Sequence, residues 1–184
     1  MRIIGGQFRG RKIEQPDSKT IRPTKDRIRE ALFNMIAERI PYSEVLDLFA
    51  GSGAFGLEML SRGAKKAVFV DNDPLSAETI RNNVKSLEIA EYSEIIMEDA
   101  FRHISIMFGQ KQGFDIIFVD PPYNMGLAKK SLILINQYDI LNPSGLLILE
   151  HHVDEKIFEL AENITILKQK TYKNISVSIF RKND

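Results

Sequence analysis

The fold is decided by the stretch Val45-Leu-Asp-Leu-Phe-Ala-Gly-Ser-Gly-Ala-Phe-Gly56. It runs from a strand-like segment through three glycines, Gly51, Gly53 and Gly56, into a helical pattern that starts at Leu57. Glycines at this spacing allow a tight turn and let a ligand approach the backbone closely, while the next helix presents its amino end to that ligand. The stretch therefore predicts a strand–turn–helix unit that forms the floor of a cofactor site.

An acidic residue ends the next apolar run. Asp71 closes Ala67-Val-Phe-Val70, twenty residues after Gly51, and an acid at this point can accept both hydroxyls of a ribose. The turn lacks a Gly-Lys-Ser/Thr phosphate cradle, which argues against an NTPase. Nicotinamide or flavin binding is the main competing interpretation, because Gly51-x-Gly53-x-x-Gly56 matches the dinucleotide fingerprint.

A second motif, Asp120-Pro121-Pro122-Tyr123, follows the apolar run Phe114–Val119. Its two consecutive prolines fix φ and remove two backbone donors, so the strand must stop there. A carboxylate, backbone carbonyls and an aromatic ring are then held at the end of the strand, which suits a flat substrate that bears an amine. Together with Asp47 inside the first strand, this motif counts against a nicotinamide or flavin enzyme.

Strand-like and helical segments alternate along most of the chain. With near-continuous apolar strands, this alternation predicts a three-layer α/β fold of the Rossmann type, with a mostly parallel sheet covered on both faces. A hairpin of segments 164–172 and 175–180, turning at Lys173-Asn174, is expected to add one antiparallel C-terminal strand. The other expected strands span 45–49, 67–71, 93–97, 114–119 and 145–150, and the expected helices span 54–63, 74–88, 100–108, 126–140 and 154–162.

Composition narrows the function classes. The 184 residues carry no net charge and no cysteine, which excludes disulfides, zinc–thiolate sites and cysteine nucleophiles. No apolar stretch approaches the roughly 20 residues that a membrane span needs, so we expect a cytoplasmic protein that binds neither membrane nor metal. No linker is visible, and we expect one domain over 1–184, with a catalytic core at 41–184.

The amino-terminal segment 1–40 is basic. It holds ten Lys and Arg residues against five Asp and Glu residues, a local charge surplus that suits phosphate groups. Residues 2–13 are expected to form a short hairpin or extended arm. After Pro23, Thr24 can cap a helix whose apolar positions, Ile28, Leu32, Met35 and Ile36, share one face.

These motifs together resemble a known enzyme family. Asp47-x-Phe-Ala-Gly-Ser-Gly, the strand-end acids Asp71 and Asp99, and Asp120-Pro-Pro-Tyr123 are similar to S-adenosylmethionine-dependent methyltransferases that act on exocyclic amines of bases. Arg2-Ile-Ile-Gly-Gly-Gln-Phe-Arg-Gly-Arg-Lys12 and Ile21-Arg-Pro-Thr-Lys-Asp-Arg-Ile-Arg-Glu-Ala-Leu-Phe-Asn34 look like the amino end of bacterial small-subunit (16S) rRNA guanine-N2 methyltransferases of the RsmD type. The resemblance runs from Arg2 to about Glu150. Asp71 stands where relatives often carry Glu, and Tyr123 where some carry Phe.

The resemblance implies a role for each matching position. The Asp120 carboxylate and the Pro121 carbonyl would accept the two amine hydrogens, and Tyr123 would stack on the base. Asp99 could bind the adenine or could equally well cap a helix. Asp73 is expected to cap the helix that starts at Pro74. The implied cofactor site comprises Asp47, Phe49, Ala50, Gly51, Ser52, Gly53, Asp71, Asn72, Asp99 and Ala100. The expected contacts to 16S rRNA, within a small-subunit ribosomal particle, are Arg2, Arg9, Arg11, Lys12, Arg22 and Lys25.

Two alternatives stay open. One is an adenine-N6 methyltransferase of DNA or RNA, which uses the same Asp-Pro-Pro-Tyr motif but generally needs an inserted recognition domain. The other is a catalytically silent rRNA-binding assembly factor that keeps the fold. The intact glycines and the intact Asp120 tetrapeptide speak against the silent binder.

Overall fold

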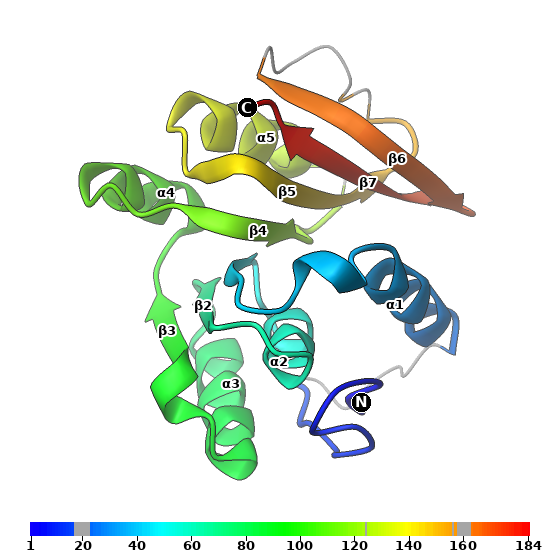
Figure 1. The fold of residues 1–184 in the computed structure, drawn as a ribbon, viewed down its shortest axis with the longest axis vertical. Helices are drawn as coiled ribbons and strands as arrows, with labels where there is room; N and C mark the ends of the chain where they lie inside the picture. Colours follow the sequence, from blue (N-terminus) through cyan, green and yellow to red (C-terminus); the bar gives the residue numbers. More distant parts are fainter. Residues whose placement is uncertain (17–22, 124, 156, 158–162) are drawn as a thin grey trace.

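A computed structural model describes residues 1–16, 23–123, 125–155, 157 and 163–184 of the chain. In this described part, seven strands form one sheet in the order β3-β2-β1-β4-β5-β7-β6 (Figure 1). The strands are β1 (Glu44–Leu48), β2 (Lys66–Asp71), β3 (Ser93–Met97), β4 (Phe114–Val119), β5 (Leu141–His152), β6 (Ile164–Tyr172) and β7 (Ile175–Lys182). The helices are α1 (Pro23–Met35), α2 (Ala54–Ser61), α3 (Pro74–Leu87), α4 (Ala100–Gly109) and α5 (Leu127–Gln137), with short 3₁₀ turns η1 (Ala37–Arg39) and η2 (Ala90–Tyr92).

The sheet is parallel from β3 to β5, and β7 runs antiparallel to both of its neighbours. This confirms the predicted three-layer Rossmann-like fold with one antiparallel C-terminal strand. The order reverses between β1 and β4, so the carboxyl ends of β1, β2 and β4 border the crevice in which such sheets bind ligands.

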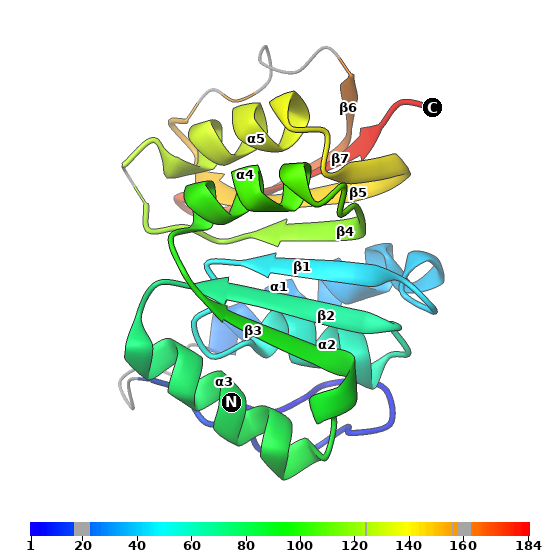
Figure 2. The same ribbon diagram turned by 90° about the vertical axis from the view of Figure 1, so that its left-hand side faces the viewer.

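Two apolar layers separate the sheet from its helices. Helices α1, α2 and α3 cover one face, where Phe33, Leu57 and Ile80 are buried. Helices α4 and α5 cover the other, where Ile104 and Leu132 are buried, and Figure 2 shows the two layers on opposite sides of the strands. The alternation of strand and helix therefore yields the three layers that the sequence predicts.

Most predicted boundaries agree with the structure to within one or two residues, and the exceptions have local causes. Strand β5 begins at Leu141 rather than 145, because Leu141 pairs with Phe114 before the ladder is interrupted. Helix α5 ends at Gln137 because Asp139 has a φ of 53°. Helix α1 begins at Pro23, so Thr24 lies in its first turn and does not precede it. The helix expected at 154–162 falls largely outside the described residues.

The amino-terminal arm is a docked hairpin. Arg2 and Lys12 form an antiparallel bridge, and Ile3 and Ile13 are buried in the same core cluster as α1 and α2. Gly6 has a φ of 73°, and a Cβ there would lie 1.8 Å from the carbonyl oxygen of Ser61. The tip of the hairpin is therefore seated against the carboxyl end of α2.

Candidate active site

The glycine turn leaves an open floor at the end of β1. Gly51 and Gly53 have φ values of 55° and 73°, which favour glycine. A Cβ on Gly51 would meet nothing within 4 Å, whereas a Cβ on Gly56 would lie 2.3 Å from the Phe69 ring. Gly56 thus permits close packing of α2 on the sheet, while Gly51 borders empty space that a ligand can enter.

Asp71 links this turn to the end of β2. Its Oδ2 accepts the Gly51 N–H at 2.8 Å and its Oδ1 accepts the Asp73 N–H at 2.9 Å. Asp73 in turn caps α3, as predicted, by accepting from the backbone N–H of Ser76 at 2.9 Å. The Asp71 carboxylate is therefore held in place, and each of its oxygens keeps a further acceptor position.

Asp47 is buried beneath the turn, with 1% of its surface exposed. Its Oδ2 accepts the Gly56 N–H at 3.0 Å. Loss of solvation raises the pKa of Asp47 to about 8, despite this hydrogen bond, and the negative charges of Asp120 and Asp71 add to the rise. Asp47 is therefore largely protonated at neutral pH unless a cation enters the site.

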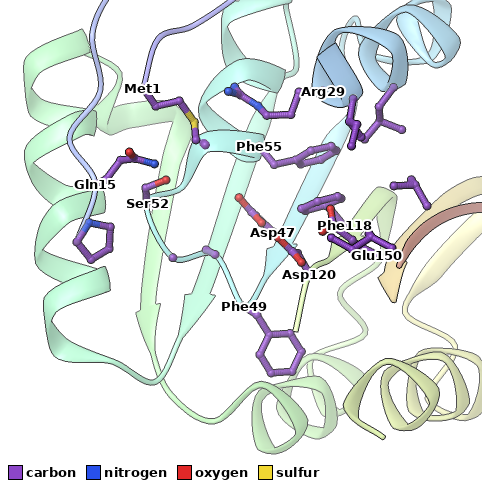
Figure 3. Close-up of a pocket in the computed structure, with 18 residues that line it drawn as sticks. Met1, Gln15, Arg29, Asp47, Phe49, Ser52, Phe55, Phe118, Asp120 and Glu150 are labelled. Carbon is purple, nitrogen blue, oxygen red and sulfur yellow. The ribbon is translucent and has the colours of Figure 1, made fainter. Parts of the chain in front are cut away.

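Asp120 joins two cavities. The first, of about 370 Å³, extends from the glycine turn to α1 and β7; the second, of about 390 Å³, lies between Asp71 and Tyr123. Phe49 and Asp120 line both. In Figure 3, Asp47 and Asp120 lie next to each other at the centre of the first cavity. A ligand on the glycine turn would thus end beside Asp120.

Tyr123 is hydrogen-bonded to a residue near the end of β5. Its hydroxyl donates to Oε1 of Glu150, which lines the first cavity. Glu150 is absent from the sequence-based site, yet it closes the apolar run Leu146–Leu149 as Asp71 closes its own. The same pattern, an acidic residue directly after an apolar strand, could therefore have identified Glu150 from the sequence.

An aromatic wall and a buried ion pair complete the first cavity. Phe55 stacks on Phe118 with ring centroids 3.9 Å apart. Arg29 lines the same cavity, and its guanidinium lies 3.5 Å from Glu58, a fully buried acid that also accepts from Arg62 at 2.8 Å. No local sequence signal marks the contacts of Phe55 with Phe118 and of Arg29 with Glu58, because they join elements far apart in the chain.

The structure assembles most of the expected site residues. Six of them line the first cavity, namely Asp47, Phe49, Ala50, Gly51, Ser52 and Asp120. The second adds Asp71, Asn72, Pro121 and Tyr123. Gly53, Asp99 and Ala100 line neither cavity. Asp99 instead caps α4, accepting the N–H groups of Phe101 and Arg102 at 3.0 and 2.9 Å through Oδ1, so adenine binding by Asp99 stays a prediction.

The expected RNA contacts lie away from these cavities. Arg2 donates to the Gly10 carbonyl and Arg11 to the Ser86 carbonyl, each at 2.7 Å. Both side chains, with Arg9 and Lys12, are exposed. Ser86 is near the carboxyl end of α3, so this part of the arm lies towards the amino ends of the parallel strands. Arg22 and the side chain of Lys25 fall outside the described residues.

Neither a membrane-spanning helix nor a metal-ligand cluster occurs in the part of the chain that the structure describes. Its helices are too short or too polar to cross a bilayer. Its His, Asp and Glu side chains form no group of three or more that could hold a metal ion.

Comparison with known proteins identifies the family. The chain is 37% identical over 182 residues to "Ribosomal RNA small subunit methyltransferase D" of Haemophilus influenzae, covering 98% of this chain and 93% of that protein. A solved structure of a hypothetical protein from Thermus thermophilus matches with a TM-score of 0.80 and 29% identity, over 97% of this chain and 98% of that one. SMU.776, solved as a complex with SAH, shares the fold alone, at 18% identity and a TM-score of 0.68 over 88% of this chain and 50% of that chain.

The family model described as "Conserved hypothetical protein 95" matches residues 1–181. This match covers the basic arm, the glycine turn and the Asp120 motif together, which confirms the resemblance drawn from those motifs. The chain therefore belongs to this family, the RsmD family.

Proposed function

We propose that the protein is an S-adenosylmethionine-dependent methyltransferase that modifies the exocyclic N2 amine of a guanine in small-subunit (16S) rRNA, within a small-subunit ribosomal particle. The observation that carries the proposal is the position of Asp120, which lines both the cavity above the glycine turn and the cavity in front of Tyr123. The name of the Haemophilus influenzae relative supports the rRNA substrate.

The residues present fit the cofactor. The open space above Gly51 accepts a ligand close to the backbone, and the held carboxylate of Asp71 retains acceptor positions for the two ribose hydroxyls. Asp47, beneath the turn, would become charged opposite the ammonium group of the methionine moiety. The bound cofactor supplies an electrophilic methyl group on a sulfonium.

Asp120 would act on the target amine. The lone pair of a guanine N2 amine is delocalised into the ring, which makes it a poor nucleophile. When the Asp120 carboxylate and the Pro121 carbonyl accept the two amine hydrogens, they favour a pyramidal nitrogen whose lone pair can attack. The nitrogen would accept the methyl group, with the thioether as the leaving group, and the methylated nitrogen, positively charged and therefore acidic, would lose one proton to water. Asp120 therefore need not be a strong base.

Tyr123 would hold the base in the plane that this attack requires. Its hydroxyl is bound by Glu150, so the ring is fixed between β4 and β5. A base reached in this way must leave its helix, and stacking on the ring offsets the lost stacking by about 1–3 kcal/mol.

The test is nucleoside mass spectrometry of 16S rRNA. Small-subunit particles and naked 16S rRNA from a deletion strain are incubated with the purified protein and S-adenosylmethionine, digested and analysed. We expect N2-methylguanosine to appear in the digest. N6-methyladenosine would replace the proposal with the adenine alternative, and no methylation of either substrate would favour a silent binder.

A further inference from the structure

The hairpin of β6 and β7 carries a second concentration of positive charge. Residues 164–184 hold five Lys and Arg residues, one of them Lys173 in the turn, against one acid, Asp184. Strand β6 is an edge of the sheet (Figure 1), and most of its side chains are exposed. Three of the cations, Lys168, Lys170 and Arg181, form no ion pair with any other residue that the structure describes.

Register places these cations on the same face as the active site. Across the sheet, Glu150 pairs with Val177 and Val177 pairs with Lys170. Residues directly opposite each other project to the same side, and Glu150 and Val177 line the first cavity. Two strand spacings, about 10 Å, therefore separate the backbone at Lys170 from that at Glu150.

A β-bulge produces this arrangement. Ile166 pairs with Phe180 and Lys168 pairs with Ile179, which leaves Leu167 as an extra residue in β6. Without the bulge, Leu167 would pair with Ile179, and every later side chain of β6 would project to the opposite face. The bulge thus aims Lys168 and Lys170 towards the side of the cavity.

The cations also gather around a hollow beside this strand. A cavity of about 560 Å³ lies next to these side chains. It is lined by Lys168, Arg181 and Arg39, and Arg39 belongs to η1. Tyr172 pairs with Ile175, another residue of the first cavity, and continues the row towards the mouth of the site. Positive charge and an aromatic ring on one surface suit single-stranded nucleic acid.

We propose that this face, defined by Lys168, Lys170, Tyr172 and Arg181, binds the phosphate backbone of the RNA strand that delivers the target base to Asp120. The inference rests on the proposed function, since it takes RNA as the substrate. It adds a recognition surface formed by the carboxyl-terminal hairpin, separate from the amino-terminal arm. The RNA would follow the row of cations across β6 and β7 to the cavity.

Two variants test the face. Lys168→Ala with Lys170→Ala removes both charges. The second variant, Lys168→Gln, Gln169→Lys, Lys170→Thr and Thr171→Lys, moves them to the opposite face at unchanged composition; all four positions belong to the edge strand. The matched control is Lys111→Ala with Lys129→Ala, two exposed lysines on the α4–α5 side of the sheet. The conservative variant is Lys168→Arg with Lys170→Arg.

Binding to 16S rRNA and to small-subunit particles is measured against salt concentration, with S-adenosylmethionine affinity and thermal unfolding as checks. We expect the alanine and face-exchange variants to bind RNA on the order of tenfold more weakly, with a salt slope reduced by about 0.7 per lost contact to a single strand. The arginine and control variants should match the wild type in RNA affinity, and all four should keep wild-type cofactor affinity.

Wild-type RNA affinity and salt slope in the alanine or face-exchange variant would overturn the inference and leave the proposed function intact. Loss of particle binding with unchanged binding to naked rRNA would also overturn it, because the face would then contact a ribosomal protein. If the wild type methylates neither RNA nor particles, the proposed function itself fails.

Discussion

Oδ2 of Asp71, at the end of β2, accepts the backbone N–H of Gly51, in the turn after β1, at 2.8 Å. The acid expected to bind the ribose thus also holds the turn expected to lie beneath the cofactor. Ligand affinity and the shape of the turn are coupled through one carboxylate.

Replacement of Asp71 by Ala should weaken S-adenosylmethionine binding by about 1–3 kcal/mol, the scale of a lost hydrogen-bonding group that is charged. Titration calorimetry measures the loss, and NAD and ATP should not compete. Ser76→Ala is a suitable control, because it removes a hydroxyl that hydrogen-bonds to Asp73 at 2.9 Å and leaves Asp71 in place. Equal affinities for Asp71→Ala and wild type would remove the ribose assignment.

Cofactor binding should release a proton from Asp47 at pH 7. Its pKa of about 8 keeps it largely protonated in the free protein, and an arriving cation favours the charged form. Calorimetry in two buffers of different ionisation enthalpy should report release of up to about one proton. Asp47→Asn should abolish this buffer dependence, and its persistence in that variant would assign the proton to another group.

The raised pKa of Asp47 also predicts how the free energy of unfolding changes with pH. Because the pKa of Asp47 is raised in the folded state, from 3.8 to about 8, the folded state binds more protons than the unfolded state in that range. The contribution to stability is complete below about pH 4 and is lost as pH rises towards 8. Denaturant unfolding of Asp47→Asn should lack this component. Parallel pH profiles for the two proteins would contradict the burial argument.

Asp120→Asn should lower the single-turnover methyl-transfer rate by about a hundredfold or more, because an amide NH₂ would face the amine where a hydrogen must be accepted. Cofactor affinity should stay nearly intact. Incorporation of tritiated methyl into small-subunit rRNA or particles measures the rate. A wild-type rate in this variant would contradict the proposed mechanism.

The pair Tyr123 and Glu150 should behave as one unit. Tyr123→Phe keeps the ring and should stay within severalfold of the wild-type rate, whereas Tyr123→Ala should lose activity in line with about 1–3 kcal/mol of stacking. Glu150→Leu combined with Tyr123→Phe should cost no more than the larger single effect, because both remove the same hydrogen bond. Fully additive losses would show that Glu150 acts independently of Tyr123.

Combined alanine replacement of Arg9, Arg11 and Lys12 tests the amino-terminal arm. If the arm contacts RNA, binding should weaken across sequences, and the salt slope should fall by up to about 0.9 for each lost phosphate contact on duplex. Cofactor titration should be unchanged. Tight binding with an unaltered slope would make the arm a structural element, in keeping with its docking on α2 and α3.

The sequence alone predicted the parts of the molecule that depend on neighbours in the chain. Apolar periodicity indicated the strands and helices, and the turn chemistry of Gly51, Gly53 and Pro121 marked where strands end. Gly51, Asp71, Asp99 and Asp120 were predicted to share one crevice because parallel strands present their carboxyl ends at a common edge. Of these four, Asp99 lines neither cavity.

Tertiary structure decided the contacts that depend on which strands become neighbours. Glu150 meets Tyr123 only because β5 lies beside β4, and the burial that raises the pKa of Asp47 exists only once α2 covers β1. Leu167 shows the limit most clearly: its strand was predicted, but the bulge that turns Lys168 and Lys170 towards the site is set by pairing with β7. Local pattern specifies what a segment becomes, whereas the face that a side chain occupies depends on register with a distant strand, which no neighbouring residue encodes.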